Sequence, residues 1–171
     1  MSLVGNSCAC LFRCCESLVD ISELYNIDFS NVTNVAQMFQ FCSSLTYVQN
    51  LNTSNVINFE YMFANCTNIV TIMGINLSSA VSDLSSTSYS SPLYRIFHSC
   101  YLLENITFYG SINASLDLSN SDNLTHDSIM SAINALGETT ATKTLTLGTT
   151  NLSKLTDAEK TIATAKGWTL I

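Results

Sequence analysis

Hydrophobic positions follow a frame that is repeated four times in the first two thirds of the chain. The frame reads Phe-x-x-Cys-x-x-Leu/Ile-x-x-Val/Ile and begins at Phe12, Phe39, Phe63 and Phe97. Before each Cys, apolar residues stand at i, i+3, i+4 and i+7, which is the spacing of one apolar stripe on a helix. After each Cys, a short apolar segment predicts a buried strand. The pattern therefore predicts helix–strand units that each bury an apolar face against their neighbours.

The last third of the chain loses the Phe-x-x-Cys frame but keeps alternating helix and strand signals. Residues 129–136 carry another apolar stripe, which predicts a helix closed by Gly137 as a left-handed C-cap. Residues 143–147 alternate with period two, as in a strand with one solvated face. The capping box at 156–159 predicts a last helix that ends at Gly167, before a closing strand.

These signals predict an α/β fold: a solenoid of short helices and a parallel β-sheet with about six coils, in a single domain over residues 1–171. Residues 1–108 hold the Phe-x-x-Cys repeats, with a Ser-rich insertion at 79–91, and residues 109–171 hold divergent closing repeats and a polar C-terminal cap. No polar cap precedes the first repeat. We therefore expect an exposed N-terminal edge through which the chain could self-associate.

Composition and charge narrow the choice of partners. Apolar residues make up 47% of the chain and charged residues 11%, which excludes the disordered class. The formal net charge of −7 argues against nucleic acid or an anionic membrane as a partner, because both attract Lys and Arg. No apolar run approaches the ~20 residues that span a bilayer, so we predict no membrane insertion. The first residues are too short and too weakly basic for a signal peptide. We therefore expect either a protein that stays inside the cell or one whose export signal is absent because it was removed ahead of this sequence.

Cysteines recur at one place in the repeat. Cys15, Cys42, Cys66 and Cys100 are 27, 24 and 34 residues apart, which predicts a ladder of small buried thiols. Neighbouring coils about 4.8 Å apart would allow a disulfide by distance. Side chains that point the same way give poor geometry for one, so reduced thiols are favoured. The cluster at residues 8–15 lacks paired Cys-x-x-Cys knuckles, so no metal site is predicted.

No catalytic constellation is visible in the sequence. The two histidines, His98 and His126, stand in no ligand-spaced pattern, and there is no Gly-x-Ser-x-Gly elbow or Gly-rich phosphate loop. We therefore predict no catalytic residues and no cofactor. A hydrolase that uses a serine with His98 or His126 is the third and weakest functional hypothesis, after the two that are given below.

Ligand-binding residues are expected on the strand face turned to solvent. If the apolar strand positions point inward, the residues between them form two outward rows. The first row is Tyr47, Thr71 and Asn105, and the second is Gln49, Met73 and Thr107. An exposed Tyr and Met among amides and hydroxyls suit a protein- or glycan-binding surface. The alternative is an ordinary solvated sheet.

The phrase Asn-Val-x-Asn-x-x-x-Met-Phe-x-x-Cys-x-x-Leu/Ile at residues 31–45 and 55–69 resembles the BspA-type leucine-rich-repeat surface proteins of bacteria. The resemblance covers roughly residues 6–108. It implies a right-handed leucine-rich-repeat-like solenoid, an extracellular location at the cell surface, and adhesion to a host or bacterial surface protein or glycan, without catalytic residues. The second hypothesis, from another class, is a structural spacer or phage-type fibre segment with no specific ligand.

Overall fold

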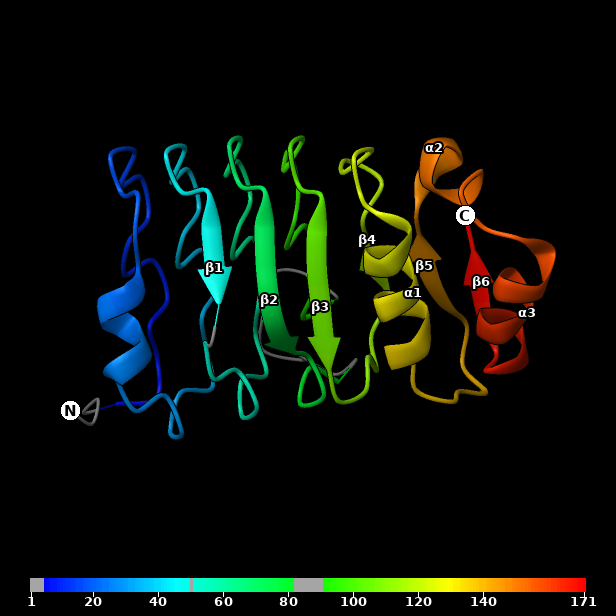
Figure 1. The fold of residues 1–171 in the computed structure, drawn as a ribbon. Helices are drawn as coiled ribbons and strands as arrows, with labels where there is room; N and C mark the ends of the chain where they lie inside the picture. Colours follow the sequence, from blue (N-terminus) through cyan, green and yellow to red (C-terminus); the bar gives the residue numbers. More distant parts are fainter. Residues whose placement is uncertain (1–4, 50, 82–90) are drawn as a thin grey trace.

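The computed structural model describes residues 5–49, 51–81 and 91–171, and shows the repeats side by side along the molecule (Figure 1). Its strands form two three-stranded parallel sheets, β1-β2-β3 and β4-β5-β6. In chain order the elements are the 3₁₀ helix η1 (Ser22–Asn26), β1 (Tyr47–Gln49), β2 (Thr71–Asn76), β3 (Asn105–Tyr109), β4 (Leu116–Asp117), α1 (His126–Ala135), β5 (Lys143–Thr146), α2 (Gly148–Leu152), α3 (Asp157–Ala165) and β6 (Trp168–Leu170).

The expected right-handed leucine-rich-repeat-like solenoid of about six coils is wrong. It required a short helix in every repeat and one continuous parallel sheet. In the described part of the chain, α-helices occur only between residues 126 and 165, and the strands are divided between two sheets. In the first repeat, the strand expected at residues 18–21 does not form, and η1 follows that segment. The Ser-rich insertion predicted at 79–91 falls largely on residues 82–90, outside the described residues.

The apolar stripes of the repeats form turns and not helices. In the second repeat, Gln37 and Phe41 have φ of 59° and 64°, the left-handed region that an α-helix of L-residues avoids. The N–H of Met38 donates to the carbonyl of Val35 at 3.0 Å, which closes a four-residue turn. Left-handed residues recur at the matching places of the other repeats: Cys10, Cys14, Tyr61, Asn65, Arg95 and Ser99. Successive turns thus produce the i, i+3, i+4, i+7 spacing that predicted a helix.

Backbone hydrogen bonds join the turns of one repeat to those of the next. We call the stacked turns at residues 7–15, 34–42, 58–66 and 92–100 the turn ladder. In the second repeat, the N–H groups of alternate residues donate to carbonyls of the third repeat at 2.8–3.0 Å, namely those of Val35, Gln37, Phe39 and Phe41. The first and third repeats donate to the following repeat in the same way. Each repeat is therefore fixed to its neighbour as strands are fixed in a sheet.

Phenylalanine rings from the four repeats stack through the core. The ring centroids of Phe12 and Phe39 are 5.6 Å apart, those of Phe39 and Phe63 are 5.6 Å apart, and those of Phe63 and Phe97 are 6.0 Å apart, all nearly parallel. Phe39 and Phe63 are fully buried. The prediction that equivalent apolar side chains from successive repeats pack together is confirmed for these rings.

Three of the four ladder cysteines are buried thiols with a defined partner. The Sγ–H groups of Cys42, Cys66 and Cys100 donate to the carbonyls of the phenylalanines one repeat earlier at 3.0–3.2 Å. Burial raises the pKa of Cys42 to about 11 and that of Cys100 to about 12. Cys15 is exposed, and within the described residues no repeat precedes the first one to cover it.

Helix α1 ends the first sheet by taking the place of the next strand beside β3. The hydroxyls of Ser128 and Ser131 on α1 accept from the N–H groups of Ile106 and Phe108, each at 3.0 Å. These serines satisfy the edge of β3 that another strand would otherwise pair with, which explains why the expected continuous sheet stops there.

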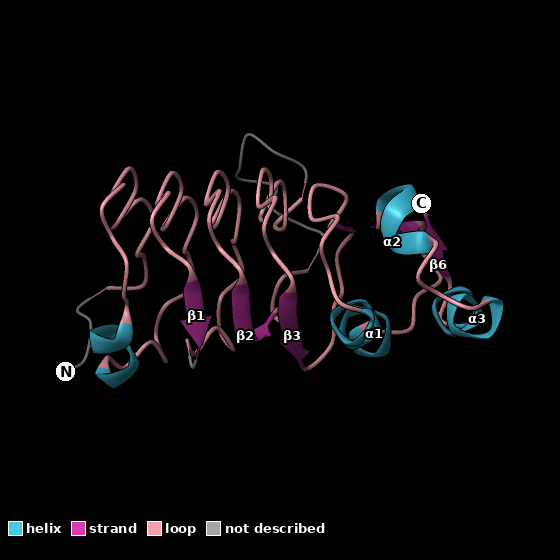
Figure 2. Cartoon of the chain, turned by 45° about the horizontal axis from the view of Figure 1, so that its top comes forward, coloured by secondary structure: helices cyan, strands magenta, loops and turns pink. Residues whose placement is uncertain are grey.

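The two sides of the repeats are continued by different elements. Helices α1 and α3 follow the row of strands β1–β3 (Figure 2). The second sheet begins beside the turn ladder, where the side chain of Asn120, just after β4, accepts from the N–H of Ser99 at 3.0 Å. Along the molecule, the second sheet therefore continues the side of the turn ladder, and helices α1 and α3 continue the side of strands β1–β3.

The closing elements agree with the sequence except at one cap and at helix α2, which was not predicted. The capping box of Thr156 and Glu159 begins α3, Gly167 has φ of +86°, and β5 and β6 lie where strands were expected. The predicted left-handed C-cap at Gly137 is wrong, because its φ is outside that region. The Asn113 Oδ1 atom lies 2.4 Å from the place a Cβ of Gly137 would take, so this glycine permits a close approach.

Candidate binding surface

The first predicted row of ligand-binding residues is brought together by the register of the first sheet. Tyr47 pairs with Thr71, and Thr71 pairs with Asn105. All three are at least partly exposed. The next residue of each strand points inward and is buried, as the sequence predicted: Val48, Ile72 and Ile106.

The second predicted row is interrupted after its second member. Gln49 pairs with Met73, and both are at least partly exposed, with the hydroxyl of Tyr47 donating to Gln49 Oε1 at 2.6 Å. The register between β2 and β3 then shifts between Ile72 and Ile75. As a result, the Thr107 hydroxyl accepts from the N–H of Gly74 at 2.8 Å and is not aligned with Met73.

The same irregularity exposes a residue that the sequence did not single out. Tyr109, at the end of β3, is 64% exposed. Its Cε2 atom lies 2.6 Å from the place a Cβ of Gly74 would take, so the ring approaches the β2 backbone where only glycine leaves room. A glycine inside a predicted strand is the signal that could have indicated this bulge and close approach.

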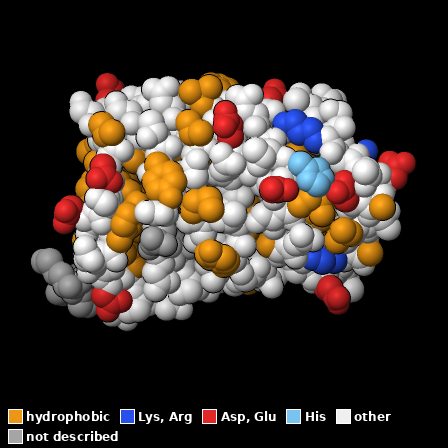
Figure 3. All heavy atoms as spheres, viewed as in Figure 1, with side chains coloured by type: hydrophobic (Ala, Val, Ile, Leu, Met, Phe, Trp, Pro, Cys, Tyr) orange, Lys and Arg blue, Asp and Glu red, His pale blue; other side chains and the backbone are white. Residues whose placement is uncertain are grey.

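A hollow adjoins Tyr109 at the end of the first sheet. Its volume is about 290 Å³ and its wall combines an aromatic ring with amides and hydroxyls: Leu51, Asn52, Thr53, Ser54, Gly74, Asn76 and Tyr109. Apolar side chains gather over β1 and β2 on this face of the molecule, with few charged groups among them (Figure 3). We call Tyr47, Gln49, Met73 and Tyr109 the sheet face.

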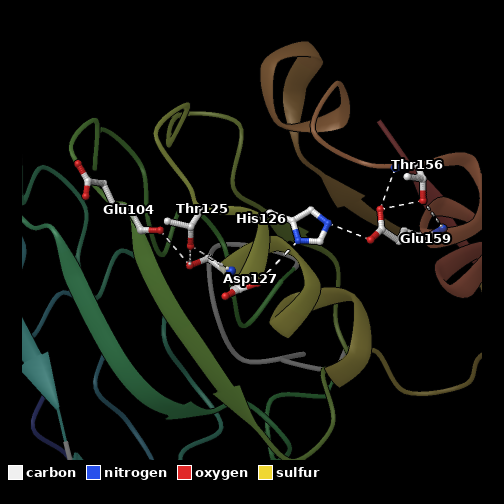
Figure 4. Close-up of polar contacts among 7 residues, drawn as sticks. Glu104, Thr125, His126, Asp127, Thr156 and Glu159 are labelled. Carbon is white, nitrogen blue, oxygen red and sulfur yellow. Dashed lines mark hydrogen bonds and ion pairs between the residues drawn. The ribbon is translucent and has the colours of Figure 1, made fainter.

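The histidine with a carboxylate partner joins two helices. His126 Nε2 lies 2.9 Å from Glu159 Oε1, and His126 Nδ1 lies 3.7 Å from Asp127 Oδ1 (Figure 4). Glu159 also accepts from the backbone N–H and hydroxyl of Thr156 at 2.8 and 2.9 Å, and these hydrogen bonds hold the pKa of its carboxyl below the usual range. This carboxylate therefore caps α3 and ties it to the start of α1.

Within the described residues, the ring nitrogens of His126 contact two carboxylates. The hydroxyl of Ser128 donates to the carbonyl of Glu104 at 2.9 Å and accepts from the N–H of Ile106 at 3.0 Å. His98 borders a hollow of only about 10 Å³, which is the size of a single water molecule. His126 thus links two helices, and the hollow beside His98 has room for no more than a water molecule.

Groups of three or more metal-ligating side chains are not found in the described part of the chain. The exposed cysteines of the first repeat, Cys10, Cys14 and Cys15, carry free thiols.

None of the described helices has the length and apolar character needed to cross a bilayer.

Comparison with known proteins identifies the repeat region. Residues 6–104 match the model of the family DUF285, described as Mycoplasma protein of unknown function. No curated protein and no solved structure matches the chain. The match covers more than half of the 171 residues and coincides with the stacked Phe-x-x-Cys repeats. The chain therefore belongs to the DUF285 family.

Proposed function

We propose that the chain is a non-catalytic binding module of BspA-like bacterial surface proteins, displayed outside the cell, which binds a surface protein or glycan of a host or of another bacterium. The sheet face would be its contact surface. Membership of DUF285, together with the BspA-like phrase in the repeats of this chain, supports the link to surface proteins.

The observation that carries the proposal is the rigid presentation of exposed aromatic and thioether side chains. Tyr47, Met73 and Tyr109 are all exposed, yet they stand on paired strands whose inner residues are fully packed. Large side chains held on a fixed backbone lose little conformational entropy on binding, and Tyr is common at binding hot spots. A sheet that only had to stay solvated has no need for these residues.

The test is binding of fluorescently labelled protein to intact epithelial and bacterial cells, measured by flow cytometry. The variants are Tyr47→Ala, Met73→Ala and Tyr109→Ala, and the matched control is Tyr101→Ala, a tyrosine that is 55% exposed on a turn outside the sheet. Since exposed residues contribute little to folding, all four should keep wild-type denaturation midpoints.

We expect each sheet-face variant to lose about tenfold or more in cell binding, the loss typical of a hot-spot residue, while the Tyr101 variant binds as wild type. If wild-type protein binds no cell surface, or if all four variants bind equally, the sheet face is not a contact surface. The alternative of a spacer or fibre segment without a ligand would then be preferred.

A further inference from the structure

The hollow beside Tyr109 is built from the ends of three successive strands. We call it the Tyr109 hollow; it is lined by residues 51–54, Gly74, Asn76 and Tyr109. Asn76 is the last residue of β2 and Tyr109 the last residue of β3. Thr53 is buried, and its hydroxyl donates to the Asn76 carbonyl at 2.9 Å and accepts from the Asn76 N–H at 2.8 Å. These hydrogen bonds fix one repeat to the next where the hollow lies.

Two asparagines in the wall of the hollow have oriented amide groups. Asn52 Oδ1 accepts from the N–H and the hydroxyl of Ser54 at 3.2 and 2.7 Å, and Asn76 Oδ1 accepts from the N–H of Ser78 at 2.9 Å. Because a backbone N–H can only donate, these hydrogen bonds assign the oxygen of each amide. In the described part of the chain, neither Nδ2 group has an acceptor. Both amides therefore keep their N–H donors for a ligand.

The Tyr109 ring supplies an apolar wall with a polar end. The residue is 64% exposed although its ring packs against the backbone at Gly74. Among the described residues, its hydroxyl has no hydrogen-bond partner. Since the ring lies against a strand, it offers an aromatic surface whose position is set before a ligand arrives.

The charge and size of the hollow restrict the ligand. None of its lining residues is charged, and the whole chain carries a formal net charge of −7. A charged ligand would find no partner here, and an anionic one would be repelled. The volume of about 290 Å³ is at the lower end of the range of about 300–1,000 Å³ that is usual for small-molecule sites. A small neutral group is thus the ligand that fits.

We propose that the Tyr109 hollow binds the terminal sugar of a neutral glycan, with the C–H groups of the sugar on the Tyr109 ring and its hydroxyls accepting from the Nδ2 groups of Asn52 and Asn76. The face of an aromatic ring is negative and attracts weakly positive C–H groups, and a hydroxyl both donates and accepts. A neutral sugar presents both kinds of group on one small ring. The assignment rests on the proposed function and selects the glycan from its two classes of ligand.

The test is binding of the protein to an array of immobilised oligosaccharides that end in glucose, galactose, mannose or N-acetylglucosamine, beside sialylated and sulfated forms. Asn52→Asp keeps an oxygen for the Ser54 hydrogen bonds and replaces the Nδ2 donor with a carboxylate oxygen. The matched control is Asn34→Asp, because Asn34 Oδ1 accepts from the N–H of Ala36 at 2.9 Å in the same way but does not line the hollow. The third variant, Tyr109→Ala, removes the ring.

We expect wild-type protein to bind one or more of the neutral oligosaccharides in preference to the acidic forms. Tyr109→Ala and Asn52→Asp should each weaken this binding by about tenfold or more, and Asn34→Asp should leave it unchanged. Three results would overturn the assignment: no oligosaccharide bound, a preference for the acidic forms, or equal binding by the wild type and all three variants.

Treatment of the cells separates this assignment from the proposed function. Periodate oxidation of cell-surface glycans should abolish binding of the wild-type protein to cells. Binding that survives periodate but is lost after tryptic digestion of surface proteins would assign the sheet face a protein ligand, which refutes the neutral glycan and leaves the proposed function standing. If the wild-type protein binds neither cells nor any oligosaccharide, both fail.

Discussion

The stack of phenylalanine rings makes a quantitative prediction for Phe63→Ala. Phe63 is 0% exposed and lies between the rings of Phe39 and Phe97 at 5.6 and 6.0 Å. Truncation of a buried phenylalanine costs about 3–5 kcal/mol through lost transfer energy and the cavity left behind. Both ring contacts are lost as well, and each contributes about 0.5–1.5 kcal/mol beyond the buried area. The free energy of unfolding should therefore fall by a value in the upper part of the 3–5 kcal/mol range.

The matched comparison is Phe12→Ala, at the end of the same stack. Phe12 has one ring neighbour in the stack, Phe39, and is only partly buried, so its truncation should cost at least about 1 kcal/mol less than that of Phe63. Urea denaturation followed by circular dichroism measures both losses. A loss below about 1 kcal/mol for Phe63→Ala, or equal losses for the two variants, would refute a core built from stacked repeats.

Other predictions concern the sheet edge, the bulge, a helix cap and the thiols. Ser128→Ala leaves the buried Ile106 N–H without its acceptor and should lower the free energy of unfolding by about 1–3 kcal/mol in urea denaturation. Gly74→Ala should lower it by more than about 1 kcal/mol, because φ is +81° and the new Cβ meets the Tyr109 ring. Glu159 has a lowered pKa in the folded state, so its stabilisation is present above the ordinary glutamate pKa and is lost as pH falls through the folded value; the difference in urea midpoint between wild type and Glu159→Gln should vanish in acid. A thiol reagent should titrate the three exposed cysteines of the native protein and all seven after denaturation, and a fourth fast thiol would contradict the buried ladder.

The sequence predicted which side chains are buried better than it predicted the backbone that buries them. Residues such as Met38 and Cys42 are fully buried, as their spacing indicated. The same spacing arises from a helix and from successive four-residue turns, because both return a side chain to one face after three or four residues. The helix and the series of turns differ in the left-handed φ of residues such as Gln37 and Phe41. Neither glutamine nor phenylalanine is a residue type that favours this conformation, so the sequence did not indicate it.

The candidate surface was predicted where the strands are regular and was missed where they are not. Period-two alternation placed Tyr47, Thr71 and Asn105 in one row without knowledge of the turns. It could not foresee that a bulge at Gly74 would remove Thr107 from the second row and bring Tyr109 forward. Alternation is a local property, whereas register depends on how two separate segments pair.

The two sides of the repeat region end differently. Inside the repeat region, alternate N–H groups of each turn donate to carbonyls of the next repeat. After Cys100 the chain places the second sheet beside the turn ladder and helix α1 beside β3. Different side chains accept the backbone hydrogen bonds at these two places. The serines of α1 supply acceptors to the edge of β3, while Ser91 and Asn120 supply acceptors to the outer donors of the turn ladder. The side chains of α1 thus close the first sheet at β3, while on the other side of the molecule the stack of turns gives way to the second sheet.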